Sequence, residues 1–151
     1  MWSFRATLTQ KAILSSTITL PNTLLSIGNN AFQGSAITTL TIPDTVTHIG
    51  AGAFRDGQLQ SVTLGTGLTN LGSEVFRNNR LTSVAFNGAL PGSLGTNIFT
   101  GNSGLGINDS IMVTALEWAR YRSASSSFGV AANTIGVRSD DINLESDFIF
   151  S

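Results

Sequence analysis

The chain repeats itself every 22 residues, and this regularity excludes most ways of folding it. Three blocks align at this period without gaps, over residues 18–39, 40–61 and 62–83, and a fourth begins at Val84 with one residue inserted. A unit this short cannot bury its own apolar side, so equivalent residues of successive units should stack at the strand spacing of about 4.8 Å. The sequence predicts a solenoid. The alternative, a β-sandwich with coincidental spacing, is disfavoured because both phase and residue type recur.

Apolar side chains recur at matching positions of the repeats, and the most regular position is aromatic. One phenylalanine stands there in each repeat, and we expect these rings to form one buried column. A glycine also recurs at one position, and six further positions are aliphatic or nearly so. The aligned columns are Ile18, Leu40, Val62, Val84; Leu20, Ile42, Leu64, Phe86; Leu24, Val46, Leu68, Leu90; Ile27, Ile49, Leu71, Leu94; Gly28, Gly50, Gly72, Gly95; Ala31, Ala53, Val75, Ile98; Phe32, Phe54, Phe76, Phe99; and Ile37, Leu59, Leu81.

Within a repeat, residues 59–64 have the L-x-x-L-x-L spacing of a leucine-rich repeat. Strand alternation predicts that Val62 and Leu64 point inward and that Ser61 and Thr63 point outward. Residues 45–49 also alternate, which indicates a short second strand before Gly50 turns the chain. Polar runs such as residues 56–57 and 78–79 are expected to supply the last turn of each repeat.

The segment from Leu40 to Phe54, which reads LTIPDTVTHIGAGAF, resembles the BspA-type leucine-rich repeat of bacterial and protist surface proteins. The pattern of that family is roughly I-P-x-S-V-T-x-I-G-x-x-A-F, often closed by a turn that contains cysteine. Here residues 33–36 and 55–58 fill that turn without cysteine. The resemblance covers residues 18–122. It implies a β-rich leucine-rich-repeat solenoid of about four repeats with caps and a short C-terminal helix.

The two ends are expected to differ from the repeats. We predict an N-terminal cap strand over 1–17, the solenoid over 18–106, a strand-helix cap over 107–128 and a C-terminal strand segment over 129–151. The cap should contain a strand at 111–113 and a helix at 115–122, with loops at 101–106 and 123–127. Alternating apolar residues at the two ends could pair with neighbouring molecules; the candidates are Trp2, Phe4, Phe148 and Phe150.

The composition argues against several classes of function. Only 11% of the residues are charged and the net charge is -1, so a nucleic-acid partner is not expected. Cysteine is absent and His48 is the single histidine, which argues against a cysteine or histidine metal site. Known catalytic motifs are missing, so we expect no enzyme activity, no catalytic residue and no cofactor. No apolar stretch approaches 18 residues, so no membrane insertion is expected.

Two charged groups leave alternatives open. Asp141, Asn143, Glu145 and Asp147 occupy alternate positions, and could bind calcium or form the acidic face of an edge strand. Arg55 and Arg77 occupy the same position in successive repeats. They could bind an anionic ligand, or pair with Asp56 in a solvated turn. Glu74 is interpreted as an isolated surface acid.

The candidate ligand surface is neutral. Short hydroxyl side chains flank the inward residues of each predicted strand and should align from repeat to repeat. The candidate ligand-binding residues are Thr17, Thr19, Thr39, Thr41, Gln60, Ser61, Thr63 and Ser83. The simpler interpretation is the preference of threonine for exposed strands. Ice binding is a third possibility, but Ala85 interrupts the row.

The leading hypothesis is a non-enzymatic adhesion or binding module with a protein or glycoprotein partner, or a glycan. The resemblance implies an extracellular or cell-surface location, although residues 1–5 do not read as an export signal. One alternative is a structural subunit of a fibre, appendage or coat that self-assembles through its terminal strands. Another is the accessory domain of an enzyme whose catalytic part lies elsewhere.

Overall fold

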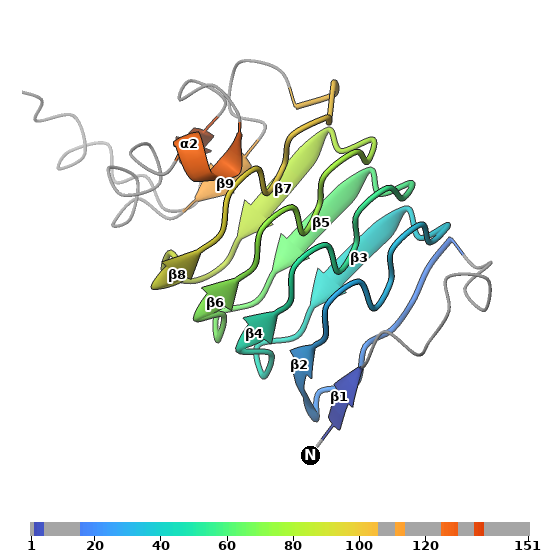
Figure 1. Cartoon of the computed structure of the whole chain (residues 1–151). Helices are drawn as coiled ribbons and strands as arrows, with labels where there is room; N and C mark the ends of the chain where they lie inside the picture. The colour runs from blue at the N-terminus through green and yellow to red at the C-terminus, as the bar shows by residue number, and fades with distance from the viewer. Residues whose placement is uncertain (1, 5–15, 106–110, 114–124, 130–134, 138–151) are drawn as a thin grey trace, which may run out of the picture.

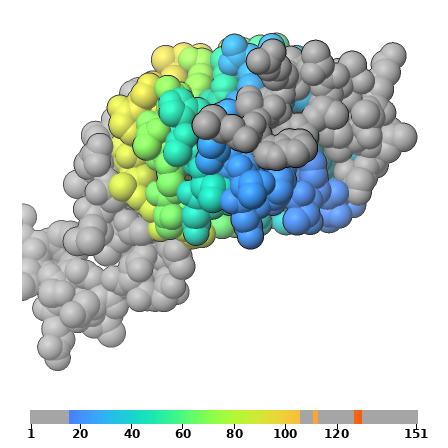
Figure 2. Space-filling model, turned by 90° about the horizontal axis from the view of Figure 1, so that it is seen from below, coloured from blue at the N-terminus to red at the C-terminus, as the bar shows by residue number. Residues whose placement is uncertain are grey.

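The computed structural model describes residues 2–4, 16–105, 111–113, 125–129 and 135–137. Within these residues the chain forms a parallel β-solenoid, in which each turn of the coil contributes one strand to each of two sheets (Figure 1). The predicted leucine-rich-repeat solenoid is therefore confirmed. Seen from below, the repeats lie as successive bands from blue to yellow along the molecule (Figure 2).

All strand pairs in the two sheets are parallel, as a coil of repeats requires. We call them the long-strand sheet and the short-strand sheet. The long-strand sheet contains, in spatial order, β10 (Ile135–Val137), β9 (Ile111–Val113), β7 (Ser83–Phe86), β5 (Ser61–Leu64) and β3 (Thr39–Ile42). The short-strand sheet contains β1 (Trp2–Phe4), β2 (Leu24–Ile27), β4 (His48–Ile49), β6 (Asn70–Leu71) and β8 (Ser93–Leu94).

The register of the strands reproduces the period of the sequence. In the long-strand sheet, Leu40 lies opposite Val62, which lies opposite Val84. The second strand predicted for residues 45–49 is shorter than expected and contains only β4. Its first part is a turn instead, closed by a 3.1 Å hydrogen bond from the Val46 N–H to the carbonyl of Pro43.

The buried core lies between the two sheets and consists of the aligned apolar columns. Val62 and Leu64 are buried, whereas Ser61 and Thr63, which alternate with them along β5, are more exposed, as predicted. Most other column residues are also at most 5% exposed; Ile18, Leu90 and Leu94 are partly buried and pack against the core.

The four phenylalanines form the single buried column that the repeat predicted. The ring centroids of Phe32 and Phe54 lie 5.1 Å apart, those of Phe54 and Phe76 lie 5.7 Å apart, and those of Phe76 and Phe99 lie 5.5 Å apart. The rings are within 12° of parallel, and all four are at most 1% exposed. Aromatic pairs stabilise a core beyond the area that they bury, so this column ties each repeat to the next.

A fifth phenylalanine, which the sequence did not identify, packs at the C-terminal end of this column. Phe128 is fully buried, and its ring meets that of Phe99 edge to face at 5.3 Å and that of Phe86 at 5.7 Å. It belongs to α2 (Ser125–Phe128), so the loop predicted over 123–127 is wrong for residues 125–127. The helix predicted at 115–122 lies outside the described residues.

The terminal strands agree with the sequence in part. Strands β1 and β9 confirm the strands expected near Trp2 and at 111–113, and β1 pairs in parallel with β2. Strand β10 lies within the C-terminal strand segment predicted over 129–151, and it adds one more strand to the long-strand sheet beyond β9. The strand and the calcium alternative placed at 141–150 lie outside the described residues, as do Phe148 and Phe150.

Each repeat turns at two positions where the backbone is left-handed, with φ between 55° and 82°. Such a backbone favours glycine and asparagine. The first position holds Asn30, Gly52, Glu74 and Asn97, and the second holds Gly34, Asp56, Asn78 and Gly101. The expected turns near residues 56 and 78 are confirmed. Glutamate is unusual in this conformation. Glu74 is therefore an exception among these residues, and its side-chain contacts, described below, explain why it is there.

Two buried asparagines connect the backbones of neighbouring repeats. The Asn79 side chain donates to the carbonyls of Phe54 at 2.7 Å and Phe76 at 3.0 Å, and its Oδ1 accepts from the Leu59 N–H at 3.0 Å. Asn102 repeats this arrangement one turn later. Residues 78–79 lie at the turn that the sequence predicted. The turn is not wholly at the surface, because Asn79 is only 6% exposed and its amide satisfies backbone groups of the core.

Candidate binding surface

The outward side of the long-strand sheet carries short, uncharged side chains in two rows. We call this surface the strand face; it consists of Thr17, Thr39, Thr41, Ser61, Thr63, Ser83 and Ala85. One row runs through Thr17, Thr39, Ser61 and Ser83, each paired with the next in parallel register. Six of the eight predicted ligand residues therefore lie together on one surface.

The other two predicted residues lie beside the strand face. Thr19 is exposed but belongs to no strand. Gln60 is exposed just before β5, where its N–H donates to the carbonyl of Thr38 at 2.7 Å. Thr63 lies opposite Ala85, and Ala85 lies opposite Met112 of β9, so the second row loses its hydroxyls at the C-terminal end.

The hydroxyls of the strand face from Thr39 to Ser83 differ in their hydrogen bonding from four threonine hydroxyls elsewhere in the solenoid. Thr38, Thr47, Thr69 and Thr82 each donate to a backbone carbonyl of the preceding repeat, over 3.0 to 3.3 Å. No hydrogen bond within the described residues uses the hydroxyls of the strand face from Thr39 to Ser83. Those groups remain able to bond to water or to a partner.

The backbone beneath the strand face is held by the core. Alternate residues of β3, β5 and β7 point inward and are at most 2% exposed. The outward threonines are β-branched and have few rotamers. A partner would therefore meet a surface that loses little conformational entropy on binding.

Charged side chains gather away from the strand face, on the turns that precede and follow the phenylalanine column. We call this cluster the charged ridge; it consists of Arg55, Asp56, Glu74 and Arg77. Asp44 and Arg80 are the other aspartate, glutamate, lysine or arginine residues of the described part of the chain. None of the strands of the long-strand sheet contains a charged residue.

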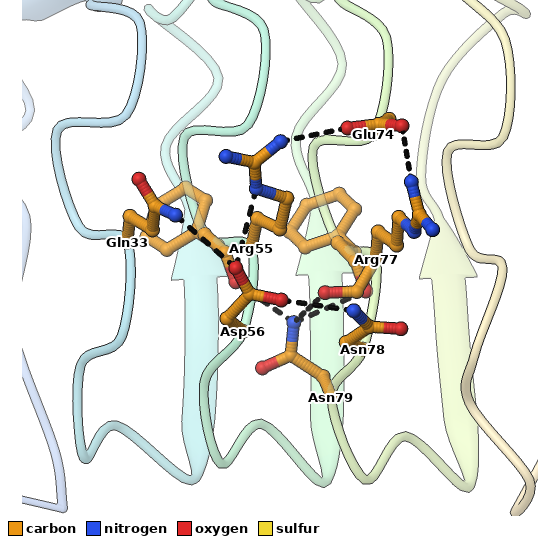
Figure 3. Close-up of polar contacts among 9 residues, drawn as sticks. Gln33, Arg55, Asp56, Glu74, Arg77, Asn78 and Asn79 are labelled. Atoms are coloured by element: carbon orange, nitrogen blue, oxygen red, sulfur yellow. Dashed lines mark hydrogen bonds and ion pairs between the residues drawn. The ribbon is translucent and has the colours of Figure 1, made fainter.

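Glu74 joins the two stacked arginines of the ridge (Figure 3). Its Oε2 accepts from Arg55 Nη1 at 2.8 Å, and its Oε1 accepts from Arg77 Nη1. The interpretation of Glu74 as an isolated acid is thus wrong. Like charges one repeat apart repel, and a shared carboxylate removes that repulsion. This contact accounts for a glutamate at a left-handed position that its neighbours fill with glycine or asparagine.

Asp56 forms the second centre of the ridge. Its Oδ1 accepts from Asn78 Nδ2 at 2.9 Å, and its Oδ2 accepts from Gln33 Nε2 at 3.1 Å and lies 3.3 Å from Arg55 Nε (Figure 3). The expected pairing of Arg55 with Asp56 is confirmed. Because Asp56 and Glu74 neutralise the arginines beside them, the geometry does not favour the alternative that the arginines bind an anionic ligand.

These contacts lower the pKa of both carboxyl groups. The hydrogen bonds from Arg55 and then Arg77 hold the pKa of Glu74 below its ordinary value of 4.5. The hydrogen bond from Asn78, with smaller contributions from Gln33 and the two arginines, outweighs burial and lowers the pKa of Asp56 below 3.8. A carboxyl group with a lowered pKa stabilises the fold above its unfolded-state pKa, and this contribution is lost as the pH falls through the folded-state pKa.

We therefore expect Glu74→Gln to flatten the acid side of the stability profile. In the wild-type protein the melting temperature should fall more steeply below pH 4.5 than in the variant, because only the wild type must protonate Glu74. Thermal melts followed by circular dichroism from neutral pH downwards would measure both profiles. Asp44→Asn is the control, since that acid contacts no arginine and bonds only to the Thr66 N–H. Parallel acid profiles for wild type and Glu74→Gln would contradict the assignment.

Among the described residues, one further candidate group is His48. His48 is exposed on β4, and its Nδ1 lies 2.7 Å from the hydroxyl of Thr47, as expected for a surface histidine. In the described part of the chain, no three histidine, cysteine or acidic residues gather as metal ligands would. No helix among those residues has the length and apolar character needed to cross a membrane.

Comparison with known proteins gives one match. The family model described as "BspA type Leucine rich repeat region" matches residues 10–106 in six copies. This range contains the four repeats and extends to residues 10–17, which the sequence analysis assigned to the N-terminal cap. No curated protein and no solved structure matches the chain.

Proposed function

Because this chain belongs to the BspA-type leucine-rich repeat family, we propose that it is a non-enzymatic binding module that presents its strand face to a protein or glycan. Repeats of this family generally serve in binding, and the proteins that contain them are typically found at surfaces. We extend this to an adhesive role at the cell surface or outside the cell. No residue is proposed as catalytic and no cofactor is proposed.

The observation that carries the proposal is the set of aligned strand-face hydroxyls from Thr39 to Ser83, which make no hydrogen bond within the described residues. The hydroxyls of Thr38, Thr47, Thr69 and Thr82, which lie outside the strand face, instead donate to the backbone. The strand face is uncharged, so its contacts with a partner would consist of hydrogen bonds and van der Waals packing. Binding of this kind depends little on ionic strength.

Two matched serines allow the surface to be tested. Ser83 on β7 and Ser93 on β8 are both exposed, but they lie on the long-strand and short-strand sheets respectively. After a partner has been captured from cell-surface proteins and glycans, its affinity for each variant would be measured by biolayer interferometry. We expect Ser83→Lys to weaken binding by about tenfold or more, because a lysine in an uncharged interface must lose its hydration. Ser93→Lys should stay close to the wild type.

The proposal would fail in either of two ways. The strand face would be the wrong surface if Ser93→Lys lost affinity and Ser83→Lys did not. A binding role would lose its support if no surface protein or glycan were captured at micromolar concentration. Circular dichroism of both variants would verify that each remains folded.

A second candidate function, a structural subunit joined through terminal strands, is favoured by the position of β1. This strand is the last of the short-strand sheet at the N-terminal end, and β10 is the last of the long-strand sheet at the other. Edge strands of this kind can pair with a neighbouring molecule. Size-exclusion chromatography with light scattering should then show a mass that rises with concentration. A constant monomer mass would exclude this function.

A further inference from the structure

The junctions between successive repeats are not equally strong. At the junction of the second and third repeats, Asn79 donates to the Phe54 carbonyl and accepts from the Leu59 N–H of the preceding repeat. Asn102 makes the equivalent bonds between the third and fourth repeats. At the junction of the first and second repeats the equivalent residue is Gly57, which has no side chain to bond across.

The missing amide leaves a backbone group of the first repeat without a partner. Ile37 occupies the position of Leu59 and Leu81, and it is fully buried. Both leucine N–H groups donate to an asparagine Oδ1, at 3.0 Å in each case. The Ile37 N–H makes no hydrogen bond within the described residues. A buried N–H without an acceptor weakens the packing around it.

The ion pair from Arg55 to Glu74 crosses from the second repeat to the third and has no counterpart at the first junction within the described residues. The first junction has other side-chain bonds: Gln33 donates to Asp56, Thr45 and Thr47 donate to the carbonyls of Leu24 and Leu25, and Asn29 accepts from the Ala51 N–H. None of these bonds satisfies a fully buried N–H, as the Asn79 and Asn102 amides do. The phenylalanine N–H groups donate across all three junctions, so the buried amide is what distinguishes the first junction from the other two.

We propose that the junction between the first and second repeats is a built-in opening point, at which the first repeat separates while the later repeats stay folded. In a linear array each repeat is held only by its neighbours, so the weakest interface determines where the array opens. The strand face spans this junction, because Thr17 and Thr39 lie before it and Thr41 to Ser83 lie after it. A partner that contacts both sides would close it.

Three equivalent amides report on the three junctions. The N–H groups of Phe32, Phe54 and Phe76 donate to the carbonyls of Ala53, Val75 and Ile98, over 2.7, 2.9 and 2.9 Å. In native-state hydrogen exchange followed by NMR, we expect the Phe32 amide to exchange about tenfold or more faster than the other two. Equal exchange of Phe32 and Phe54 would overturn the proposal.

The variant Asn79→Ala tests whether the buried amide bridge, rather than the nearness of the end of the array, determines which amide exchanges fastest. Asn79→Ala removes the amide bridge of the second junction, so the Phe54 amide should come to exchange nearly as fast as the Phe32 amide, while Phe76 keeps its protection. Asn102→Ala is the matched variant and should expose Phe76. If Asn79→Ala accelerated all three amides equally, the solenoid would open as one unit and the proposal would be wrong. If Phe54 were unaffected, the amide bridge would not determine where the array opens.

Discussion

Gly72→Ala should destabilise the protein by about 3 kcal/mol, close to the upper end of the usual cost of overpacking. A Cβ atom at this position would lie 2.6 Å from the Ala51 N and 2.8 Å from the carbonyl carbon of Gly50. Both are backbone atoms of the preceding repeat, so no side chain can move to make room. In the glycine column, Gly50, Gly72 and Gly95 are therefore required by the close approach of the turns, rather than by an unusual φ.

Chemical denaturation by urea would measure this effect, and Gly92→Ala provides the control. A Cβ atom at Gly92 would find its nearest neighbour, the Thr69 carbonyl oxygen, 4.0 Å away. That variant should unfold at nearly the wild-type urea concentration. If the two variants were equally stable, the turns would be able to separate at no cost, and the packing described for the glycine column would be incorrect.

Asn79→Ala should cost about 2 to 3 kcal/mol, because truncation leaves the Leu59 N–H and the Phe54 carbonyl buried without their partner. Each of these groups lost water on folding and regains no bond in the variant. The loss should appear as a lower urea midpoint with the far-UV circular dichroism spectrum of the solenoid retained.

Asn78→Gly is the neighbouring control. Asn78 is exposed and its side chain bonds to Asp56, at the surface. Its removal should cost roughly 1 kcal/mol or less for the bond, and glycine adopts the left-handed backbone of this position without steric cost. An Asn79→Ala variant no less stable than Asn78→Gly would show that the buried amide contributes little.

The period of the sequence was sufficient to predict the solenoid, the strand register and the phenylalanine column, because each depends on residue type recurring every 22 positions. The hydroxyls of the strand face followed from the same alignment. Their use as a ligand surface stays a prediction, since the period determines where they lie and not what they bind.

The contacts missed by the sequence analysis are those that do not follow the period. Glu74 bonds to Arg55, which is 19 residues away, so aligned columns could not pair them. Asn79 shares its column with Gly57, and a column that holds asparagine in only part of the array looks like an ordinary turn. The spacing also changes at the C-terminal end, where Phe128 follows Phe99 by 29 residues, and this hid the aromatic residue that packs on the last ring.

The near-parallel stacking of the phenylalanine rings has a consequence for how such a protein can change in length. Each ring presents almost the same surface to the ring before it and the ring after it, at separations of 5.1 to 5.7 Å. A whole 22-residue unit could therefore be duplicated or deleted between the second and third phenylalanines while each new contact reproduces an existing one. Selection could then adjust the span of the outward hydroxyl rows in steps of one strand, without redesigning the interior.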